Sequence, residues 1–212
     1  MESGSHTPQQ ARSRKTMEKL LTATLAVIEA KGLAGVTVPE IAAAAKMSTG
    51  SVYRRFTDKD ALIRLAFLRL LESSQQVNRT ALPSDRFKGL RLDQALQKLA
   101  SGLVAQYRRR TGLLKALDQY LDAHCDAAFQ EHAVGVIEAN LKLVTVALLP
   151  FRKQIAATDP EKAITFALLS AITLIEAHKL HNSPVWQRIL PLDDKALAAE
   201  TARTMAAYLS AK

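Results

Sequence analysis

The spacing of the apolar residues is the feature that most restricts the fold of this chain. In the first third they recur three and four residues apart, at Met17, Leu20, Leu21, Val27 and Ile28, so they share one face of a helix. Similar spacing continues to the C-terminus, and the chain is rich in Ala and Leu, which favour helix over strand. We therefore expect an all-α protein without β-strands.

Helix breakers and N-capping residues divide this pattern into segments. Gly32 ends the first helix, and Thr37 with Glu40 forms a capping box for the second. The pattern predicts nine helices, over about 17–31, 37–45, 48–56, 58–82, 85–110, 111–124, 126–150, 159–181 and 193–211. The segment 182–192 is expected to be a loop. We expect a disordered tail over residues 1–11, a three-helix domain over 12–58 and a larger helical domain over 59–212.

The positive charge of the chain is concentrated near its N-terminus. The net charge is +9, and residues 1–70 hold 11 Lys and Arg against 6 Asp and Glu, while residues 71–212 hold 18 against 14. Such an excess favours a polyanionic partner. Arg12, Arg14 and Lys15 precede the first predicted helix, where they could follow a DNA groove or form a solvated tail. Charge alone is equally compatible with a basic protein that has no such partner.

Three further features bear on the compartment. Cys125 is the single cysteine, which excludes an intramolecular disulfide and suits a reducing compartment. The first residues lack the basic and apolar segments of a secretory signal. The longest nearly apolar stretch, residues 163–175, is too short to span a bilayer. We expect a cytoplasmic protein that does not bind a membrane.

The span from Thr37 to Lys59 has the pattern of a helix-turn-helix. Val52 and Phe56 are four residues apart, so they can pack together onto Ile41 and Ala45 of the preceding helix. The remaining side chains of the second helix then face outward or flank that face: Thr49, Gly50, Ser51, Tyr53, Arg54 and Arg55. Such a helix fits a major groove about 12 Å wide. The Lys59 ammonium, close to the N-terminus of the next helix, suits a phosphate.

These residues resemble the DNA-binding domain of the TetR family of bacterial transcriptional regulators. The resemblance lies in Ile41-Ala42, in the run Ser48-Thr49-Gly50-Ser51-Val52-Tyr53-Arg54-Arg55-Phe56 and in Lys59-Asp60-Ala61-Leu62, and it extends over about residues 12–70. It implies a nine-helix architecture with an N-terminal helix-turn-helix domain and a C-terminal ligand-sensing and dimerisation domain. It also implies a sequence-specific regulator, a repressor that a small hydrophobic ligand releases from its operator. The alternative is an architectural or non-specific DNA-binding protein without a ligand.

The resemblance also implies a role for individual residues. Thr49, Gly50 and Tyr53 match positions that contact bases or their backbone, and Ser51, Arg55 and Lys59 match positions that contact phosphates. Thr37 matches a capping position that often does the same. The predicted DNA-binding set is Thr37, Lys46, Ser48, Thr49, Gly50, Ser51, Tyr53, Arg54, Arg55 and Lys59. Family members usually carry Gly or Asn where this chain has Lys46; a positive φ there would cost about 1 kcal/mol, although the ammonium could add a phosphate contact.

The C-terminal region contains a segment, residues 163–175, that is apolar around the whole helix. Such a helix needs cover on every side, so one side implies a partner subunit. The resemblance implies a homodimer in which the last two long helices of each subunit form a four-helix bundle. The predicted interface residues are Leu168, Ile172, Ile175, Leu197, Thr201, Met205 and Tyr208. A two-fold dimer in turn implies a pseudo-palindromic operator.

The middle helices, over about residues 60–157, resemble the ligand-sensing region of the family only in architecture. Five aromatic residues could line a cavity for the ligand or belong to an ordinary core: Tyr107, Tyr120, Phe129, Phe151 and Trp186.

Other functional classes find little support in the sequence. It contains no nucleophile elbow, glycine-rich phosphate loop or spaced pair of carboxylates, so we expect neither an enzyme nor a cofactor. The spacing of His124, Cys125 and His132, and of His178 and His181, matches no familiar zinc site, so we expect no metal. Arg108–Arg110 suit the negative end of a helix dipole, which we favour over a second anionic site.

Overall fold

The structure is a computed structural model that describes residues 8–81, 86–123, 126–181 and 184–211. Within these ranges the protein is all-α, as expected, with ten α-helices and two short 3₁₀ helices. The N-terminal helices are α1 (Pro8–Lys31), η1 (Leu33–Gly35), α2 (Val38–Ala44), α3 (Thr49–Tyr53) and α4 (Lys59–Ala81). The others are α5 (Leu92–Arg109), α6 (Thr111–Ala123), α7 (Ala127–Leu148), η2 (Leu149–Gln154), α8 (Pro160–Lys179), α9 (Pro184–Ile189) and α10 (Asp194–Ser210).

Several helix boundaries differ from the sequence prediction. Helix α5 begins at Leu92 rather than near residue 85, and α3 ends at Tyr53 rather than near residue 56. Two further differences involve a proline. Helix α1 begins at Pro8, so residues 8–11 are helical rather than part of a tail, and the basic residues from Arg12 to Lys15 lie on this helix. Helix α9 begins at Pro184 inside the segment that was expected to be a loop, and it accounts for the tenth helix. Proline is well tolerated at the start of a helix because its missing N–H would have no partner there.

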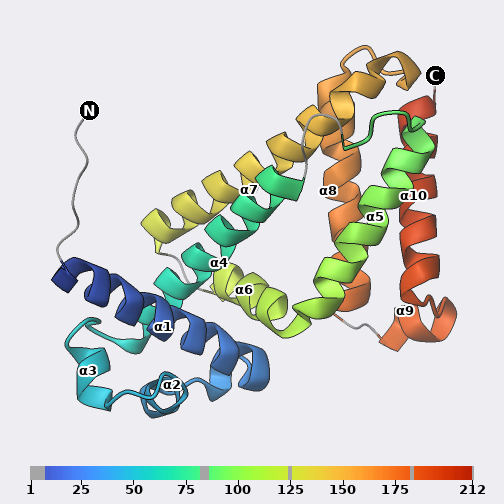
Figure 1. Cartoon of the computed structure of the whole chain (residues 1–212). Coiled ribbons are helices and arrows are strands. Elements are labelled where there is room, and N and C mark those ends of the chain that lie inside the picture. The colour runs from blue at the N-terminus through green and yellow to red at the C-terminus, as the bar shows by residue number, and fades with distance from the viewer. Residues whose placement is uncertain (1–7, 82–85, 124–125, 182–183, 212) are drawn as a thin grey trace, which may run out of the picture.

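The helices form two hydrophobic clusters, and two arms of helices lie above α1, α2 and α3 in Figure 1. The first cluster joins α1, α2, α3, α4, α6 and the start of α7, and the second joins α5, the end of α7, η2, α8 and α10. Helices α4 and α7 lie side by side in one arm, and α5, α8 and α10 in the other. The predicted domain boundary at residues 58/59 falls at the start of α4, but the first cluster continues across it because α6 packs on α1.

Helix α6 is attached to the N-terminal helices by hydrogen bonds. The carboxylate of Glu29, near the end of α1, accepts from the backbone N–H groups of Gly112 (3.1 Å) and Leu113 (2.8 Å). It therefore caps the first turn of α6, whose N–H groups have no partner within the helix. A Cβ at position 112 would lie 2.8 Å from the carbonyl oxygen of Glu29, so the close approach requires glycine. The Tyr120 hydroxyl of α6 donates to Asp60 Oδ1 of α4 at 2.7 Å.

One helical span among the described residues, Ala127–Gln154, is long and apolar enough to cross a membrane by length and composition alone. It is not the segment that the sequence pointed to. A single span of this kind is weak evidence, because core helices pass the same test. Here Phe129 and Ala133 pack in the first cluster, and Leu148 packs in the second.

Candidate nucleic-acid interface

Helices α2 and α3 are held at a fixed angle by capping and by a shared apolar face. The Thr37 hydroxyl accepts from the Glu40 N–H (3.4 Å), and the Glu40 carboxylate accepts in return from the Thr37 N–H (3.1 Å), which is the predicted capping box. The Ser48 hydroxyl accepts from the Ser51 N–H (3.3 Å) at the start of α3. Ile41, Ala45, Val52 and Phe56 are buried together, as their spacing predicts.

The outward side of α3 is exposed in the chain described here. Tyr53 is 57% exposed, which is unusual for so large an aromatic side chain. A Cβ added at Gly50 would meet no atom within 4 Å, so nothing inside the chain requires glycine at this position. All ten predicted DNA-binding residues are exposed or half-buried on α2, α3, the turn between them and the beginning of α4.

The basic side chains of this region contact the backbone and hydroxyl groups near them rather than carboxylates. Arg54 donates to the Ser51 hydroxyl (2.8 Å), Arg55 to the Ser51 carbonyl (3.2 Å) and Lys59 to the Val36 carbonyl (3.2 Å). Among the described residues, none of the three has an ion-pair partner, and neither does Lys46. Their positive charge is therefore not neutralised within the described chain.

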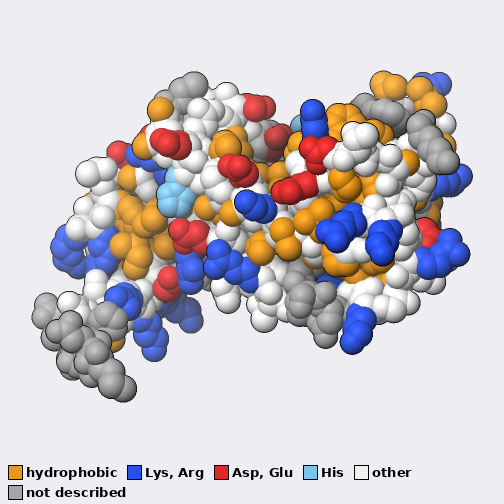
Figure 2. Space-filling view, turned by 90° about the horizontal axis from the view of Figure 1, so that it is seen from above, with side chains coloured by type: hydrophobic (Ala, Val, Ile, Leu, Met, Phe, Trp, Pro, Cys, Tyr) orange, Lys and Arg blue, Asp and Glu red, His pale blue; other side chains and the backbone are white. Residues whose placement is uncertain are grey.

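Further Lys and Arg side chains gather at the same end of the molecule. Figure 2 shows several of them at the left end of the molecule. Arg12, Arg14 and Lys15 are exposed on the first turns of α1. Long cations on a helix next to α3 extend the positive surface, which raises the attraction for a polyanion.

The turn between α2 and α3 contains a lysine in a conformation that favours glycine. Lys46 has φ 51°, the positive value considered from the sequence, and among the described residues it is the only non-glycine with positive φ. Its N–H donates to the Ala43 carbonyl (2.9 Å), and the Met47 N–H donates to the Ala42 carbonyl (2.9 Å). This pair of bonds is a Schellman motif, in which the residue at the Lys46 position must be left-handed. The Lys46 side chain is exposed.

Two carboxylates near the interface serve as caps. Hydrogen bonds from Lys31 and Thr37 lower the pKa of Glu40. The Ala61 N–H donates to Asp58 at 2.7 Å, and this bond lowers the pKa of Asp58. Both groups are therefore negative at neutral pH while they hold the helix starts in place.

The predicted dimer residues differ in how far they are exposed within the single chain. Leu168, Ile175, Leu197 and Met205 are buried in the second cluster of their own chain, and Thr201 is buried as well, although Thr201 and Met205 line the groove beside Phe166 and Tyr208. Ile172 is half-buried, and only Tyr208 is exposed. The apolar side chains of α8 that do face outward are those of Phe166 and Leu169, and the Phe166 ring packs on the Tyr208 ring with centroids 5.1 Å apart. Helices α5, α7 and α10 contact α8 and together cover much of it within the chain.

The aromatic residues predicted to line a ligand cavity do not share one. Tyr120 packs against Phe67 and Phe129 in the first cluster, with ring centroids 5.3 Å from each. Phe151 lies in the second cluster, 6.4 Å from Phe87. These residues therefore belong to two separate cores, which is the ordinary-core alternative that the sequence left open.

Tyr107 and Trp186 complete the predicted aromatic set. The Tyr107 hydroxyl donates to Glu176 of α8 at 2.7 Å, between α5 and α8, and burial raises the pKa of both groups. Tyr107 therefore joins α5 to α8 and packs against the second cluster. The side chain of Trp186 lies outside the described residues.

The histidine and cysteine candidates do not assemble into a site in the described ranges. His124 and Cys125 lie outside these ranges. Among the residues that are described, no three His, Cys, Asp or Glu side chains are placed to hold a metal ion. His132 lies 3.6 Å from the Glu72 carboxylate on α4.

Comparison with known proteins identifies the N-terminal region. Residues 20–66 match the family of bacterial regulatory proteins, tetR family. The chain has a TetR-family helix-turn-helix domain. This match covers α2, α3 and the adjoining parts of α1 and α4, and it confirms the resemblance seen in the sequence. No curated protein sequence matches the chain.

Solved structures show that the TetR-like architecture extends over about nine-tenths of the chain. A protein described as a TetR-family transcriptional regulator from Mesorhizobium loti has a TM-score of 0.68 at 19% identity, with 92% of this chain and 97% of that one covered. A tetR-family regulatory protein from Rhodococcus RHA1 has a TM-score of 0.65 at 19% identity (93% and 98% covered). FadR from Bacillus subtilis, solved in complex with stearoyl-CoA, has a TM-score of 0.64 at 13% identity (89% and 97% covered). These TetR-like chains share the fold of the present protein.

Proposed function

We propose that this protein is a cytoplasmic transcriptional regulator that binds duplex DNA sequence-specifically through α3. The observation that carries the proposal is the exposed side of α3 with Gly50 at its centre. Small residues allow close approach to bases, and the neighbouring Tyr53, Arg54 and Arg55 offer the donors that base edges and phosphates accept. We assign residues 12–58, with the preceding turn of α1, to DNA binding and residues 59–212 to ligand sensing and dimerisation.

The Gly50→Ala variant tests this proposal, because stability and binding should change in opposite directions. Alanine is about 0.5–1 kcal/mol more stable than glycine within a helix, and the space around Gly50 is open. We expect Gly50→Ala to increase the free energy of unfolding in urea but to weaken binding to an operator selected from random duplexes, measured by fluorescence anisotropy. Gly102→Ala on α5, also in open space, is the matched control and should change stability alone. Unchanged operator affinity in Gly50→Ala would refute the assignment of this face.

Two further variants separate base contacts from phosphate contacts. Tyr53→Ala should weaken operator binding by about 1–3 kcal/mol and should reduce discrimination between the operator and random DNA. Lys59→Ala should weaken binding to both and lower the salt dependence by about one unit. Equal affinity of the native protein for the selected and random duplexes would instead favour the alternative, an architectural DNA-binding protein.

We further propose that the protein acts as a two-fold homodimer. Phe166 and Leu169 of α8 and Tyr208 of α10 are 56%, 47% and 45% exposed, and Phe166 and Tyr208 border a small apolar groove between the two helices. An exposed patch of large apolar side chains is typical of an association surface. A two-fold dimer would bind a pseudo-palindromic operator whose half-sites are about 34–36 Å apart or slightly more.

The regulator is proposed to act as a repressor that a small molecule releases from DNA. The stearoyl-CoA complex of FadR shows that a protein of this fold holds such a ligand. In the present chain, α4 begins directly after the helix-turn-helix domain and continues along one arm of the larger domain, so a ligand between the arms could bias its position. A coupling of about 1–3 kcal/mol between ligand and DNA would be sufficient. Operator affinity that is unaffected by any ligand bound between the arms would exclude this mechanism.

A further inference from the structure

A cavity of about 140 Å³ lies between the second half of α4 and the C-terminal end of α5. Ser73, Ser74 and Asn78 contribute to it from α4, and Gln106, Arg109 and Arg110 from α5 and its end. Helices α4 and α5 belong to different arms and contact each other only sparsely. The cavity is therefore a place where a bound group would touch both arms.

The charges around this cavity are of one sign. Its described lining contains two arginines and no Asp or Glu. Arg108, the preceding residue, pairs with Asp194 at 3.3 Å, but in the described chain neither Arg109 nor Arg110 has an ion-pair partner. The negative C-terminal end of the α5 dipole stabilises these two cations. Each guanidinium has five N–H donors, and these remain largely available to a ligand.

The neutral side chains of the cavity suit the same kind of ligand. The Asn78 amide donates one hydrogen to Asn140 Oδ1 of α7 at 2.9 Å, which fixes its orientation and leaves a second N–H. The Ser73 hydroxyl already donates to the Leu70 carbonyl (2.8 Å), so the remaining neutral donors are this second Asn78 N–H, the hydroxyl of Ser74 and the amide of Gln106. Guanidinium groups with neutral donors match the acceptor oxygens of a carboxylate or phosphate.

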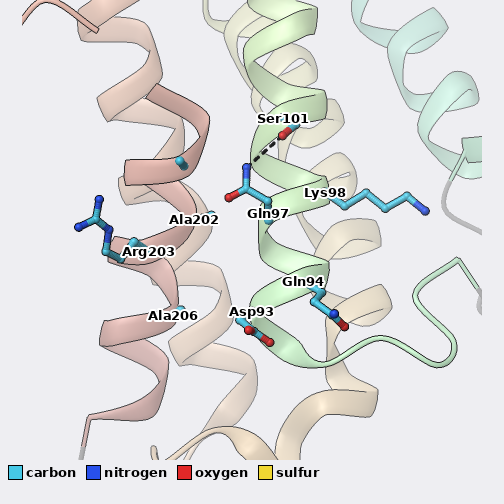
Figure 3. Close-up of a pocket in the computed structure, with 9 residues that line it drawn as sticks. Asp93, Gln94, Gln97, Lys98, Ser101, Ala202, Arg203 and Ala206 are labelled. Carbon is cyan, nitrogen blue, oxygen red and sulfur yellow. Dashed lines mark hydrogen bonds between the residues drawn. The ribbon is translucent and has the colours of Figure 1, made fainter. Parts of the chain in front are cut away.

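A larger hollow on the outside of α5 and α10 does not favour anions in the same way. It has a volume of about 740 Å³ and carries charges of both signs, with Asp93, Lys98 and Arg203 around it. Figure 3 shows that the Lys98 side chain points away from α10 and that Gln97 donates to Ser101 at 3.2 Å across the surface of α5. The chemistry of this surface does not favour one class of ligand.

We propose that the cavity between α4 and α5 binds a small anionic group, a carboxylate or a phosphate, of the effector. Its volume corresponds to about four or five water molecules at about 30 Å³ each, enough for a head group rather than a whole drug-sized ligand. The claim that the anion belongs to an effector rests on the proposed function, whereas the claim that the cavity binds an anion does not.

The experiment measures anion binding to the full-length protein without DNA. Inorganic phosphate and benzoate are titrated at constant ionic strength against chloride, and binding is followed by calorimetry and thermal shift; benzamide is the neutral counterpart of benzoate. We expect saturable binding of at least one anion, at about 1–10 mM, and none of benzamide. Arg109→Gln combined with Arg110→Gln should weaken binding at least about tenfold. Arg108→Gln, which removes the neighbouring cation outside the cavity, should leave it unchanged.

The outcomes separate this site from the proposed function. Preference for phosphate or for benzoate identifies the head group and supports the site in either case. No saturable binding of either anion, or equal binding by the native protein and the double variant, would overturn the proposal. Operator affinity is measured in parallel with and without anion. If the anion binds through Arg109 and Arg110 but does not change operator affinity, the site stands while ligand-driven release of DNA fails.

Discussion

Replacement of Lys46 by glycine tests the strain in the turn of the helix-turn-helix. Lys46 has φ 51° at the left-handed position of a Schellman motif. A residue with a Cβ pays about 1–2 kcal/mol in this conformation, and glycine does not. Glycine in turn makes the unfolded chain more flexible, which costs about 0.4–1 kcal/mol. We therefore expect Lys46→Gly to raise the free energy of unfolding by about 0.5–1 kcal/mol.

Urea unfolding provides the measurement, and Lys46→Ala is the matched control. Alanine removes the ammonium but keeps the Cβ, so it retains the strain and should give no comparable gain. For a chain of this size, 1 kcal/mol corresponds to a rise in Tm of about 2–4 °C. The reasoning is refuted if Lys46→Gly is no more stable than the native protein, or if both variants are stabilised equally.

The same pair of variants tests whether the Lys46 ammonium contacts DNA. The side chain is exposed and has no ion-pair partner among the described residues. If it contacts a phosphate, both variants should weaken operator binding equally and lower the salt dependence by about one unit. A loss of affinity in Lys46→Gly alone would mean that flexibility of the turn, rather than charge, decides binding.

Three other perturbations follow from individual contacts. Glu29→Ala should lower the free energy of unfolding by about 1–3 kcal/mol because two N–H groups of α6 lose a charged acceptor. Glu18→Ala, which breaks an exposed ion pair with Arg69, is the control and should lower it by about 1 kcal/mol or less. Equal losses of the two variants in urea unfolding would contradict the capping role of Glu29. Phe166→Arg combined with Leu169→Arg should give folded monomers in sedimentation, whereas Leu168→Arg should unfold the chain because Leu168 is 1% exposed; a dimeric Phe166/Leu169 variant would disprove the interface. The pKa of Glu40 is lowered from 4.5 and that of Asp58 from 3.8, so both carboxylates stabilise the fold above these values, and the contribution is lost as the pH falls through the lower folded pKa values. Acid unfolding should therefore begin below about pH 4.5 and become less steep in Glu40→Gln, and an identical pH profile in that variant would disprove the contribution.

The sequence by itself determined the features that depend on neighbours along the chain. The capping box of Thr37 with Glu40 and the cap at Ser48 involve residues three positions apart, so the same local geometry forms wherever the helix begins. The four-residue spacing of Val52 and Phe56 fixed which side of α3 is buried and thus which side is exposed. The positive φ of Lys46 was only a possibility raised by the family resemblance, and the structure decides it.

Only the tertiary structure decided which neighbours cover each helix. The apolar pattern of α8 showed that it needs cover, but it could not show that α5, α7 and α10 bury Leu168 and Ile175 while Phe166 and Leu169 stay outside. Spacing likewise could not separate the aromatic residues into two cores, nor place Arg109 and Arg110 beside Ser74, more than thirty residues earlier. The physical reason is that periodicity records the buried face of each helix, whereas the choice of partner depends on side-chain packing between distant segments.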